Sequence, residues 1–518
     1  MTKMKKNVTF TAVFMACAVL LAKACGMLRD MAIASLYGTG MNAVAFSTAS
    51  RIPLLFFDIA LGSAVTSAFI PVFNEYLAKG EKERAIRFSN CFITLVVLIT
   101  LIMSAAGMIF SHQFITLIAG GLDAQTHALS VVLVQILFPT IIFTGLAYCF
   151  VGILQSFGEF TVPAIISLVS NGLLIAYLFV IGDRFGVQGI AIAMLIAWSG
   201  QCIVQFPSLK KLGYTYRPTL KSESEGIKKV CKLALPIIIS TWMQPINTMI
   251  NINLASGLNG GQAIAALDYA NKLYIILVGV FTFTVTNLIF PSLSRASATQ
   301  DKAEFTSLVA RAIRYVLFLI TPIMVGFLLM STPIIRLFYE RGEFTADSTA
   351  ITATALFFYS LGMLGYGLQE IANKAFYALQ DGKTPMKVAM GGIVVNIALS
   401  ILFVSVLQVG LGGLALSASI AANLTGFFLI WKLHRSCGKL LDRNLIVYFV
   451  KILVIVAVMG VGVYGAKTLT ASLDAGKVLS VALPVCVGAI LYGAGCLILR
   501  IPELTDLVAT ITAKLKRN

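Results

Sequence analysis

The segment GVQGIAIA, residues 186–193, occurs a second time in altered form as GLGGLALS, residues 410–417. A second pair of similar segments lies just before these two copies. LQSFGEFTVP at 154–163 precedes the first copy, and its counterpart LQDGKTP at 379–385 precedes the second. The two pairs follow each other in the same order and at nearly the same separation. The chain therefore consists of two similar halves, and the nature of the repeating unit decides the fold class.

The composition indicates a membrane protein. Of the 518 residues, 58% are hydrophobic and only 12% are charged, and the mean hydropathy is +0.91. Soluble domains carry roughly a quarter charged residues, so this chain could not solvate the surface of a soluble protein. The formal net charge of +17 would suggest a nucleic-acid partner in a soluble protein. Here we assign it to cytoplasmic loops that face an anionic membrane leaflet, and we expect no nucleic acid.

Fourteen apolar segments are long enough to cross a bilayer. They lie at 8–37, 43–78, 86–111, 127–155, 161–182, 186–206, 229–257, 263–294, 307–331, 347–379, 386–408, 411–432, 446–468 and 477–499. The first segment resembles a signal peptide, but it continues into a charged amphipathic stretch without a clear cleavage site. We interpret it as a retained first span.

Each half of the repeat contains six spans, and an even number gives both halves the same orientation. Parallel repeats imply an axis along the membrane normal, a central cavity and transport by alternating access. We therefore predict an all-α polytopic membrane protein of about 14 transmembrane helices, with two parallel six-helix repeats around a central cavity plus two C-terminal helices. The predicted parts are an N-terminal lobe at 1–210, a C-terminal lobe at 211–440, two extra spans at 441–500 and a cytoplasmic tail at 501–518.

Basic residues are concentrated in alternate loops, which is the pattern of the positive-inside rule. The basic loops carry Lys3, Lys5, Lys6, Lys79, Lys82, Arg84, Arg87, Lys210, Lys211, Arg217, Lys221, Lys228, Lys229, Arg295, Lys302, Arg311, Arg314, Lys383, Lys387, Lys432, Arg435, Lys439 and Arg443. The intervening loops hold only a few basic residues. Both termini are therefore expected in the cytoplasm of a multi-pass plasma-membrane protein.

Several kinds of chemistry find no support in the residues. The nine cysteines have no CxxC spacing and mostly lie in apolar runs, so we interpret them as small buried residues rather than disulfides or metal ligands. His112, His127 and His434 are too scattered for a zinc or catalytic cluster. No GxxxxGK[ST] loop is present, so the sequence contains no sign of an ATP motor. We expect no cofactor and no bound metal, and we do not expect an enzyme.

Nine charged residues lie inside the predicted spans. They are Lys23, Arg29 and Asp30 in the first span, Arg51 and Asp58 in the second, Asp268 and Lys272 in the eighth, and Glu370 and Lys374 in the tenth. A charge at the centre of a span costs about 2.5–3.5 kcal/mol on insertion scales, so these side chains should face the bundle interior or a wet cavity. Because both halves contribute them, we expect the charges to meet at one cavity.

The simplest alternative is internal ion pairing. Asp268 and Lys272 are four residues apart, as are Glu370 and Lys374. Arg29 could be matched by Asp30 or by Asp58. Snorkelling to the membrane surface is the alternative for Lys23 and Arg51. In the first half the bases nevertheless outnumber the acids, which favours binding of an anionic group and argues against an exporter of cationic drugs. Phosphate or carboxylate suits the forked donors of arginine.

The sequence also resembles a known family along most of its length. KACGMLRDMAIASLYGTGMNAVAFSTASRIP at 23–53 is similar to the start of MurJ (MviN) proteins, which are lipid II flippases of the multidrug/oligosaccharidyl-lipid/polysaccharide exporter superfamily. Further matches in the same order are AFIPVFNEY (68–76), LDYANKLY (267–274), IFPSLSR (289–295), RGEFTADS (341–348) and AFYALQDGKTP (375–385). Each motif alone is weak, and their order and spacing carry the resemblance.

The resemblance implies a function and a site. Members of the family move lipid II, an undecaprenyl diphosphate that carries a disaccharide-pentapeptide, to the outer leaflet of the plasma membrane for peptidoglycan assembly. It implies that Lys23, Arg29, Arg51 and Lys272 bind the diphosphate and that Asp30 orients Arg29. It also implies a groove for the polyprenyl tail at the last two spans. The partners would be lipid II, membrane lipids and the cell-wall synthesis machinery.

The chain departs from the family pattern in places. Phe57 and Asp58 stand where many members carry an arginine pair, which lowers the positive charge of span two. Asn251 and Ser400 occupy positions that are acidic in members with a suggested sodium site, so sodium coupling is not expected. Asn396 is retained, and we interpret it as a hydrogen bond between helices.

Three other functions compete with lipid II flipping. A flippase for another polyprenyl-diphosphate-linked oligosaccharide would need the same basic residues in its cavity, because its substrate carries the same diphosphate. A cation-coupled exporter is disfavoured by the basic residues. A membrane-embedded enzyme of lipid-linked sugars would need a carboxylate pair or a His/Asp cluster, and the sequence offers none.

Overall fold

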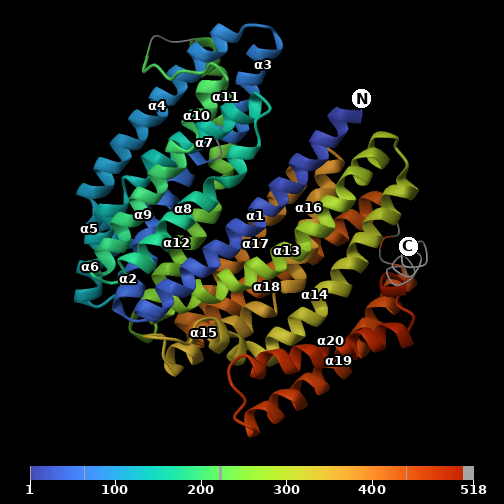
Figure 1. Ribbon diagram of the computed structural model, residues 1–518. Coiled ribbons are helices and arrows are strands. Elements are labelled where there is room, and N and C mark those ends of the chain that lie inside the picture. Colours follow the sequence, from blue (N-terminus) through green and yellow to red (C-terminus); the bar gives the residue numbers. More distant parts are fainter. Residues whose placement is uncertain (1, 63–64, 221–223, 439, 441, 506–518) are drawn as a thin grey trace. The chain divides into compact units, whose positions relative to one another are not determined.

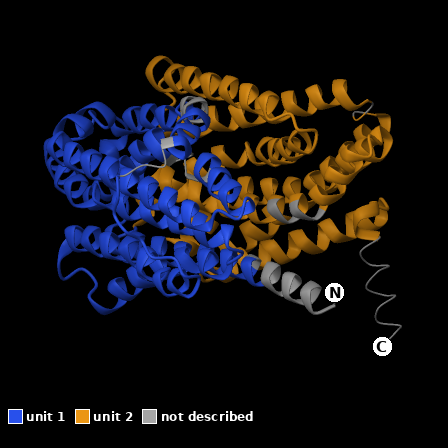
Figure 2. Ribbon diagram, turned by 90° about the horizontal axis from the view of Figure 1, so that it is seen from above, with its two compact units in different colours: residues 1–265, 341–344 blue, residues 266–340, 345–518 orange. Residues whose placement is uncertain are grey.

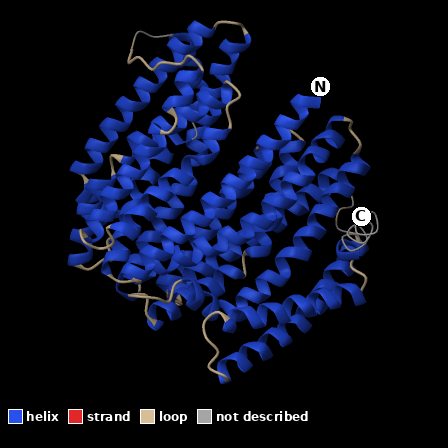
Figure 3. Cartoon of the chain, viewed as in Figure 1, coloured by secondary structure: helices blue, strands red, loops and turns tan. Residues whose placement is uncertain are grey.

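A computed structural model describes residues 2–62, 65–220, 224–438, 440 and 442–505. Within these ranges the regular elements are helices, and no strand occurs (Figure 3). The elements are α1 (Thr2–Tyr37), α2 (Met41–Phe57), η1 (Asp58–Gly62), η2 (Val65–Phe69), α3 (Ile70–Ala78), α4 (Lys82–Ile109), α5 (Ser111–Ile118), α6 (Ala124–Leu137), α7 (Thr140–Ser156), α8 (Thr161–Val180), α9 (Gly186–Ile203), α10 (Phe206–Lys211), α11 (Ser224–Thr241), α12 (Met243–Ser256), η3 (Asn259–Gly261), α13 (Gln262–Ala298), α14 (Lys302–Phe338), α15 (Ala346–Ser360), α16 (Met363–Ala378), α17 (Lys383–Ile401), η4 (Leu402–Val406), α18 (Leu411–Cys437), α19 (Arg443–Ser472) and α20 (Leu479–Ile498) (Figure 1).

The helices account for the predicted spans. In the described ranges, 11 helical segments are long and apolar enough to cross a membrane, and the pair α15 and α16, bent by 47°, brings this to 12. The remaining two predicted spans, 8–37 and 229–257, are also helical and correspond to α1 and to α11 with α12. The chain is an all-α polytopic membrane protein, as the sequence predicts.

Several predicted spans are not continuous α-helices, and two of these, spans two and seven, are connected to each other at their irregular points. Span two changes from α2 into the π-helical turns η1 and η2 before α3 begins. Span seven is interrupted at Trp242, between α11 and α12. The two irregular points are joined, because the Trp242 indole Nε1 donates a hydrogen bond of 2.7 Å to the carbonyl oxygen of Ile59 in η1. Such a bond satisfies a carbonyl at a place where the regular helical pattern changes.

The chain divides into two compact units (Figure 2). Unit 1 contains residues 1–265 and the short segment 341–344, and unit 2 contains residues 266–340 and 345–518. In unit 1, α1 packs along α8, α2 along α6 and α4 along α7. The segment 341–344 contacts the end of α1, where the amide of Glu343 donates to the carbonyl oxygen of Ser35 at 2.9 Å.

Gly38 permits this contact with the end of α1. Its φ is +55°, in the left-handed region that favours glycine. A Cβ atom placed on Gly38 would lie 2.3 Å from the carbonyl oxygen of Glu343. Any larger residue would therefore have to displace the backbone of segment 341–344.

In unit 2, α18 packs against α16 and α17, and α14 packs against α15 and α19. Two glycines bring α16 and α18 together: a Cβ on Gly365 would lie 2.3 Å from the Cα of Asn423, and one on Gly426 would lie 2.4 Å from the Gly365 carbonyl oxygen. Small residues at such crossings allow the close backbone contact from which membrane helices gain packing energy.

A cluster of charges at the end of α14 connects it to the chain before α20. The carboxylate of Glu340 accepts from the Thr349 hydroxyl at 2.9 Å. It also pairs with Arg336 at 3.0 Å and with Lys477 at 3.3 Å. Burial alone would raise the pKa of Glu340, but the hydrogen bonds from Thr349, Lys477 and Arg336 outweigh it and hold this pKa below its usual value near 4.5.

The compact units do not coincide with the halves of the sequence repeat. The repeat places span seven at the start of the second half, whereas α11 and α12 belong to unit 1. Packing accounts for this, because α11 lies against η1, η2 and α3, and α12 lies against α2 and α5. Exposed ion pairs add to these contacts, with Lys229 on α11 3.0 Å from Glu75 on α3 and Glu225 2.9 Å from Arg84 on α4. The predicted lobes at 1–210 and 211–440 stay a prediction from the repeat.

The repeat itself is visible in the backbone. Gly186, at the start of α9, has a φ of +60°, and Gly410, which precedes α18, has a φ of +70°. These two glycines open the matched segments GVQGIAIA and GLGGLALS. A glycine with positive φ therefore stands at the start of the corresponding helix in both halves.

Candidate functional site

Arg29 is the most constrained of the predicted site residues. It lies on α1 and faces α8, the helix that packs along it. Its Nε and Nη2 atoms donate to Oδ1 of Asp30 at 3.0 and 2.8 Å, and its Nη1 donates to Oδ1 of Asn171 at 2.8 Å. Asn171 is oriented in turn, because its Nδ2 donates to the carbonyl oxygen of Ala22 at 3.2 Å. The guanidinium is thus fixed by one carboxylate and one amide.

This arrangement leaves donors for a ligand. A guanidinium has five N–H groups, and the three hydrogen bonds above occupy three of them, which leaves two without a partner among the described residues. The side chain of Asp30 is 7% exposed and that of Arg29 is 19% exposed. Because the charge is shielded from bulk water, an anion that reached the remaining donors would bind through charge-assisted hydrogen bonds.

The other predicted charges of unit 1 are placed less specifically. Lys23 is half-buried on α1, two turns before Asp30 and on the same broad face of the helix. Arg51 is half-buried on α2, shortly before Pro53. Asp58 is the first residue of η1 and its side chain is exposed. Asp58 therefore lies at the point where span two leaves the regular α-helix.

In unit 2, Asp268 and Lys272 form an ion pair of 3.0 Å on consecutive turns of α13. Asp268 is 8% exposed, whereas Lys272 is 35% exposed. The ammonium group of Lys272 also lies 6.0 Å from the ring centroid of Tyr269. The acid is therefore buried while the base remains accessible, so Asp268 supports Lys272 much as Asp30 supports Arg29.

Glu370 and Lys374 on α16 differ from this pattern. Both are half-buried, and no ion pair joins them in the part of the chain that the structure describes. The ammonium group of Lys374 instead lies over the ring of Phe290, 5.6 Å from its centroid. A lysine above an aromatic face is stabilised by cation–π attraction.

Asn396 belongs to a small polar network in the middle of unit 2. Its Oδ1 accepts from Ser400 on its own helix, α17, at 3.0 Å and from Ser417 on α18 at 3.3 Å. The Ser400 and Ser417 hydroxyls are 2.7 Å apart. The predicted hydrogen bond between helices at Asn396 is confirmed. Among the described residues, no group of three or more His, Cys, Asp or Glu side chains could hold a metal ion.

An apolar groove of about 330 Å³ lies in unit 2, between α13, α14 and the last two helices, α19 and α20. Its lining is almost entirely aliphatic and aromatic. The residues are Leu277, Phe281, Pro322, Ile323, Gly326, Phe327, Met330, Ile334, Met459, Val463, Pro484, Val485, Gly488, Ala489 and Tyr492. A groove of this kind suits a hydrocarbon chain rather than a polar ligand.

Asn171 was not predicted as a site residue, although the sequence carries a signal for it. It is a lone amide in the apolar segment TVPAIISLVSNGLLIAYLFV. A polar side chain inside a span is expensive unless it has a partner, so an asparagine there indicates a polar contact. What the sequence could not indicate is that the partner is Arg29, because α1 and α8 are distant in the chain.

The chain matches the family model described as "Lipid II flippase MurJ" over residues 33–482. Among curated proteins, it is 31% identical over 447 residues to the "Probable lipid II flippase MurJ" of Rhizobium tropici, covering 84% of this chain and 82% of that protein. It is 28% identical over 424 residues to the "Lipid II flippase MurJ" of Burkholderia cenocepacia, covering 80% and 82%.

Solved structures agree with these matches. A structure described as "Lipid II flippase MurJ, inward closed conformation" superimposes with a TM-score of 0.79 at 26% identity, over 96% of this chain and 100% of that one. A multidrug transporter of the MATE family superimposes with a TM-score of 0.68 at 15% identity, over 82% of this chain, which shows a shared fold. With a family model that matches most of its length and a relative above 30% identity, this chain belongs to the lipid II flippase MurJ family.

Proposed function

We propose that this chain is a lipid II flippase, which moves the undecaprenyl-diphosphate-linked disaccharide-pentapeptide from the cytoplasmic to the outer leaflet of the plasma membrane by alternating access. The family match supports the substrate. The observation that carries the mechanism is the geometry of Arg29, which Asp30 and Asn171 hold in place while two of its donors remain without a partner among the described residues. A membrane transporter of this family is not expected to carry out catalysis.

The diphosphate is the natural ligand for such an arginine. Arginine binds phosphate oxygens through its forked donors, and the interaction is stronger where water is partly excluded. We propose Lys23 and Arg51 as further contacts to the diphosphate in unit 1 and Lys272 as the contact from unit 2. Asp30 and Asp268 would position their neighbouring bases rather than touch the substrate.

The apolar groove beside α19 and α20 supports a place for the polyprenyl tail. A long hydrocarbon tail gains about 25 cal/mol for each Å² that leaves water, but it gains little on moving from lipid into protein. The groove would therefore guide the tail rather than provide the affinity. In this proposal the affinity comes from the charged diphosphate, which has no favourable place in the bilayer interior.

The basic loops support an orientation with both termini in the cytoplasm. The chain would then be a multi-pass protein of the bacterial inner membrane, where lipid II is made on the cytoplasmic side. Membrane lipids surround it, and the cell-wall synthesis machinery would take up the flipped substrate.

Complementation tests the proposal. The resident lipid II flippase of a bacterium is depleted, this chain is expressed, and growth and externally accessible lipid II are measured. Arg29→Ala and Lys272→Ala are tested beside the parent, and Arg311→Ala, an exposed residue on α14, serves as the control. Membrane abundance is measured for every variant.

The possible outcomes distinguish an error in the proposed substrate from an error in the roles proposed for Arg29 and Lys272. We expect the parent and Arg311→Ala to restore growth and the other two variants to insert without restoring it. If the parent inserts well and lipid II stays inside, the proposed substrate is wrong, and other polyprenyl-diphosphate-linked oligosaccharides become the next candidates. If the parent and all variants work equally, the flippase assignment stands and the roles given to Arg29 and Lys272 are wrong.

A further inference from the structure

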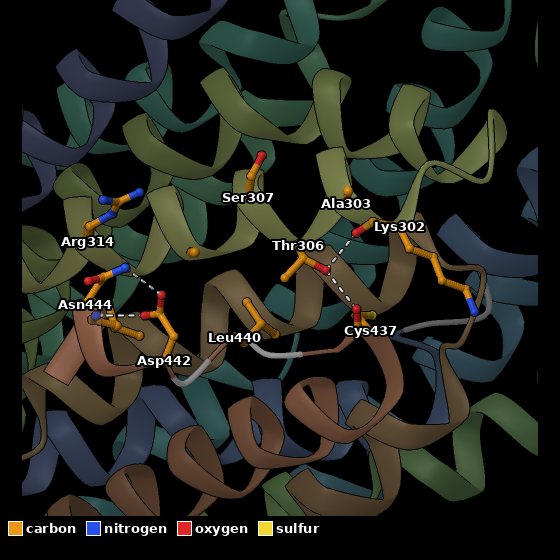
Figure 4. A pocket seen from close by; sticks show the side chains of 11 residues that line it. Lys302, Ala303, Thr306, Ser307, Arg314, Cys437, Leu440, Asp442 and Asn444 are labelled. Carbon is orange, nitrogen blue, oxygen red and sulfur yellow. Dashed lines mark hydrogen bonds between the residues drawn. The ribbon is translucent and has the colours of Figure 1, made fainter.

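A second cavity, of about 560 Å³, lies in unit 2 and is different in character from the apolar groove. One wall is the first half of α14, and the other is formed by Cys437, Leu440 and the start of α19 (Figure 4). The polar side chains that line it are Lys302, Thr306, Ser307, Arg314, Asp442 and Asn444. The four on α14 recur at helical spacing, so they form one polar face along the helix. We call this cavity the polar groove.

The two cations stand at opposite ends of the polar groove. Figure 4 shows Lys302 at one end and Arg314, close to Asn444, at the other, with the hydroxyl groups of Thr306 and Ser307 between them. The backbone positions of Lys302 and Arg314 are about 18 Å apart along α14, at 1.5 Å per residue. A single phosphate group can therefore contact only one of the two cations directly, and the other acts at longer range.

Arg314 has donors that the described protein groups leave unused. Its Nε is buried and has no hydrogen-bond partner in the described part of the chain. The nearest carboxylate oxygen, Oε1 of Glu503, is 3.9 Å from Nε, which is beyond a hydrogen bond. The Glu503 carboxylate therefore offsets part of the positive charge of Arg314 from the side of Nε. The two terminal nitrogens of the Arg314 guanidinium remain available to a ligand.

The one carboxylate that lines the groove is already occupied. Oδ1 of Asp442 accepts from the amide of Leu445 at 2.8 Å and caps the start of α19, and Oδ2 accepts from Nδ2 of Asn444 at 3.2 Å. A carboxylate at a helix N-terminus is stabilised by the partial positive charge there. Asp442 thus belongs to the helix end, and the groove keeps a positive character from Lys302 and Arg314.

The surroundings indicate that the ligand carries hydrocarbon. Leu440 and Leu445 are buried at the floor of the groove. Beyond it, α19 exposes Ile446, Val447 and Val450, with 59%, 47% and 52% of their surface accessible. Large apolar side chains exposed on a membrane-spanning helix face lipid. A molecule with a phosphate in the groove could therefore lay its chains directly along this face.

We propose that the polar groove binds the phosphate headgroup of an anionic membrane phospholipid, with Arg314 on the phosphate and Lys302 at the outer edge. The hydroxyls of Thr306 and Ser307 already donate to the carbonyl oxygens of Lys302, Cys437 and Glu304, so the two cations carry the attraction for the phosphate. By the expected orientation this end of α14 is cytoplasmic, where the leaflet is anionic. The bound lipid is a structural partner of the first half of α14 and the start of α19. The site is separate from the groove proposed for the polyprenyl tail and does not depend on the transported substrate.

The test uses the full-length protein purified in micelles and native mass spectrometry to count bound lipid. Phosphatidylglycerol is titrated, phosphatidylcholine provides the comparison without net charge, and inorganic phosphate is added in a separate arm. The variants are Arg314→Gln and Lys302→Gln, and the matched control is Arg311→Gln, which removes an exposed charge from the same helix outside the groove. Since Arg314→Gln leaves the buried Glu503 without its cation, Arg314→Lys is a second variant that keeps the charge but loses the forked donors.

We expect one phosphatidylglycerol to bind preferentially. Arg314→Gln should weaken it about tenfold or more, Arg314→Lys less so, and Lys302→Gln, which is exposed, about two- to fivefold. Arg311→Gln should bind like the parent. If inorganic phosphate displaces the lipid at low millimolar concentration, the lipid assignment is wrong and the groove is a site for a free anion. If phosphatidylcholine binds equally, or if Arg311→Gln weakens binding as much as Arg314→Gln, the proposal is overturned.

Discussion

The contact between Arg29 and Asp30 makes a quantitative prediction that a double-mutant cycle can test. Asp30→Asn removes the negative charge and leaves Arg29 with a neutral acceptor, while Arg29→Gln removes the positive charge and leaves Asp30 buried. Removing one partner of a buried ion pair costs roughly 3–5 kcal/mol. After Arg29→Gln the unpaired charge is Asp30, which is 7% exposed, and we expect about 3 kcal/mol. After Asp30→Asn the unpaired charge is Arg29, which is 19% exposed and keeps its bond to Asn171, and we expect about 2 kcal/mol.

The coupling between the two substitutions is the decisive quantity. In the double variant neither charge is left alone, so its loss of stability should be smaller than the sum of the two single losses. We expect a coupling energy of about 2 kcal/mol, within the range for residues in direct contact. Unfolding of the purified protein in mixed micelles by increasing detergent denaturant measures all four species. Asn171→Ala is a useful comparison, because it removes one neutral hydrogen bond to Arg29 and should cost about 1 kcal/mol.

Two results would refute the ion-pair reasoning, and a third would refute the positioning role of Asp30. A coupling energy below about 0.5 kcal/mol would mean that the two side chains do not depend on each other. A double variant that is less stable than the sum of the single losses would mean that the pair is not the reason for the charge inside α1. A large coupling together with unchanged flippase activity in Asp30→Asn would keep the ion pair and refute the positioning role.

Three further predictions concern the backbone contacts and the surface charge. Gly38→Ala places a Cβ 2.3 Å from the Glu343 carbonyl oxygen and should make the segment 341–344 protease-sensitive under native conditions, while unchanged cleavage would contradict the close contact. Trp242→Phe removes the hydrogen bond to Ile59 and should lower thermal stability in micelles, by an amount that corresponds to about 1 kcal/mol; a variant as stable as the parent would show that the bond is not formed. The lowered pKa of Glu340 means that its stabilising effect is present above its unfolded value near 4.5 and is lost as the pH falls through the folded value. The difference in stability between the parent and Glu340→Gln should therefore be largest at neutral pH, shrink as the pH falls below the unfolded value near 4.5 and disappear once Glu340 is protonated in the folded state. A difference that does not shrink as the pH falls would be inconsistent with an ion-pair role.

Much of the fold could be predicted because a bilayer restricts the choices. Only helices satisfy the backbone of a spanning segment, so apolar windows alone located the helices. The repeat of GVQGIAIA predicted two similar halves, and both Gly186 and Gly410, the first residues of the matched segments, have positive φ values. The irregular points in spans two and seven were not visible. Prolines marked these spans, but a proline does not reveal a π-helical turn such as η1 or the partner of Trp242.

The candidate site divides in a similar way. Charges inside spans are conspicuous, so Arg29 and Lys272 were found from the sequence. Their supports were found only where they are neighbours on the same helix, as with Asp30 and Asp268. Asn171 supports Arg29 from another helix, and the contact depends on how α1 packs along α8. The prediction that charges of both halves meet at one cavity stays a prediction.

The paired turns at Gly186 and Gly410 bear on how such a molecule can arise. Duplication of one ancestral six-helix unit would supply two identical scaffolds, and selection could then act on each copy separately. Glycine adopts a positive φ without steric cost, and a glycine with positive φ stands at the start of the corresponding helix in both copies. The charged side chains are not the same in the two copies: an arginine steadied by a carboxylate stands in unit 1, and a lysine steadied by a carboxylate stands in unit 2. Two halves that share a backbone framework can therefore carry different charged side chains, which suits a substrate that is itself asymmetric.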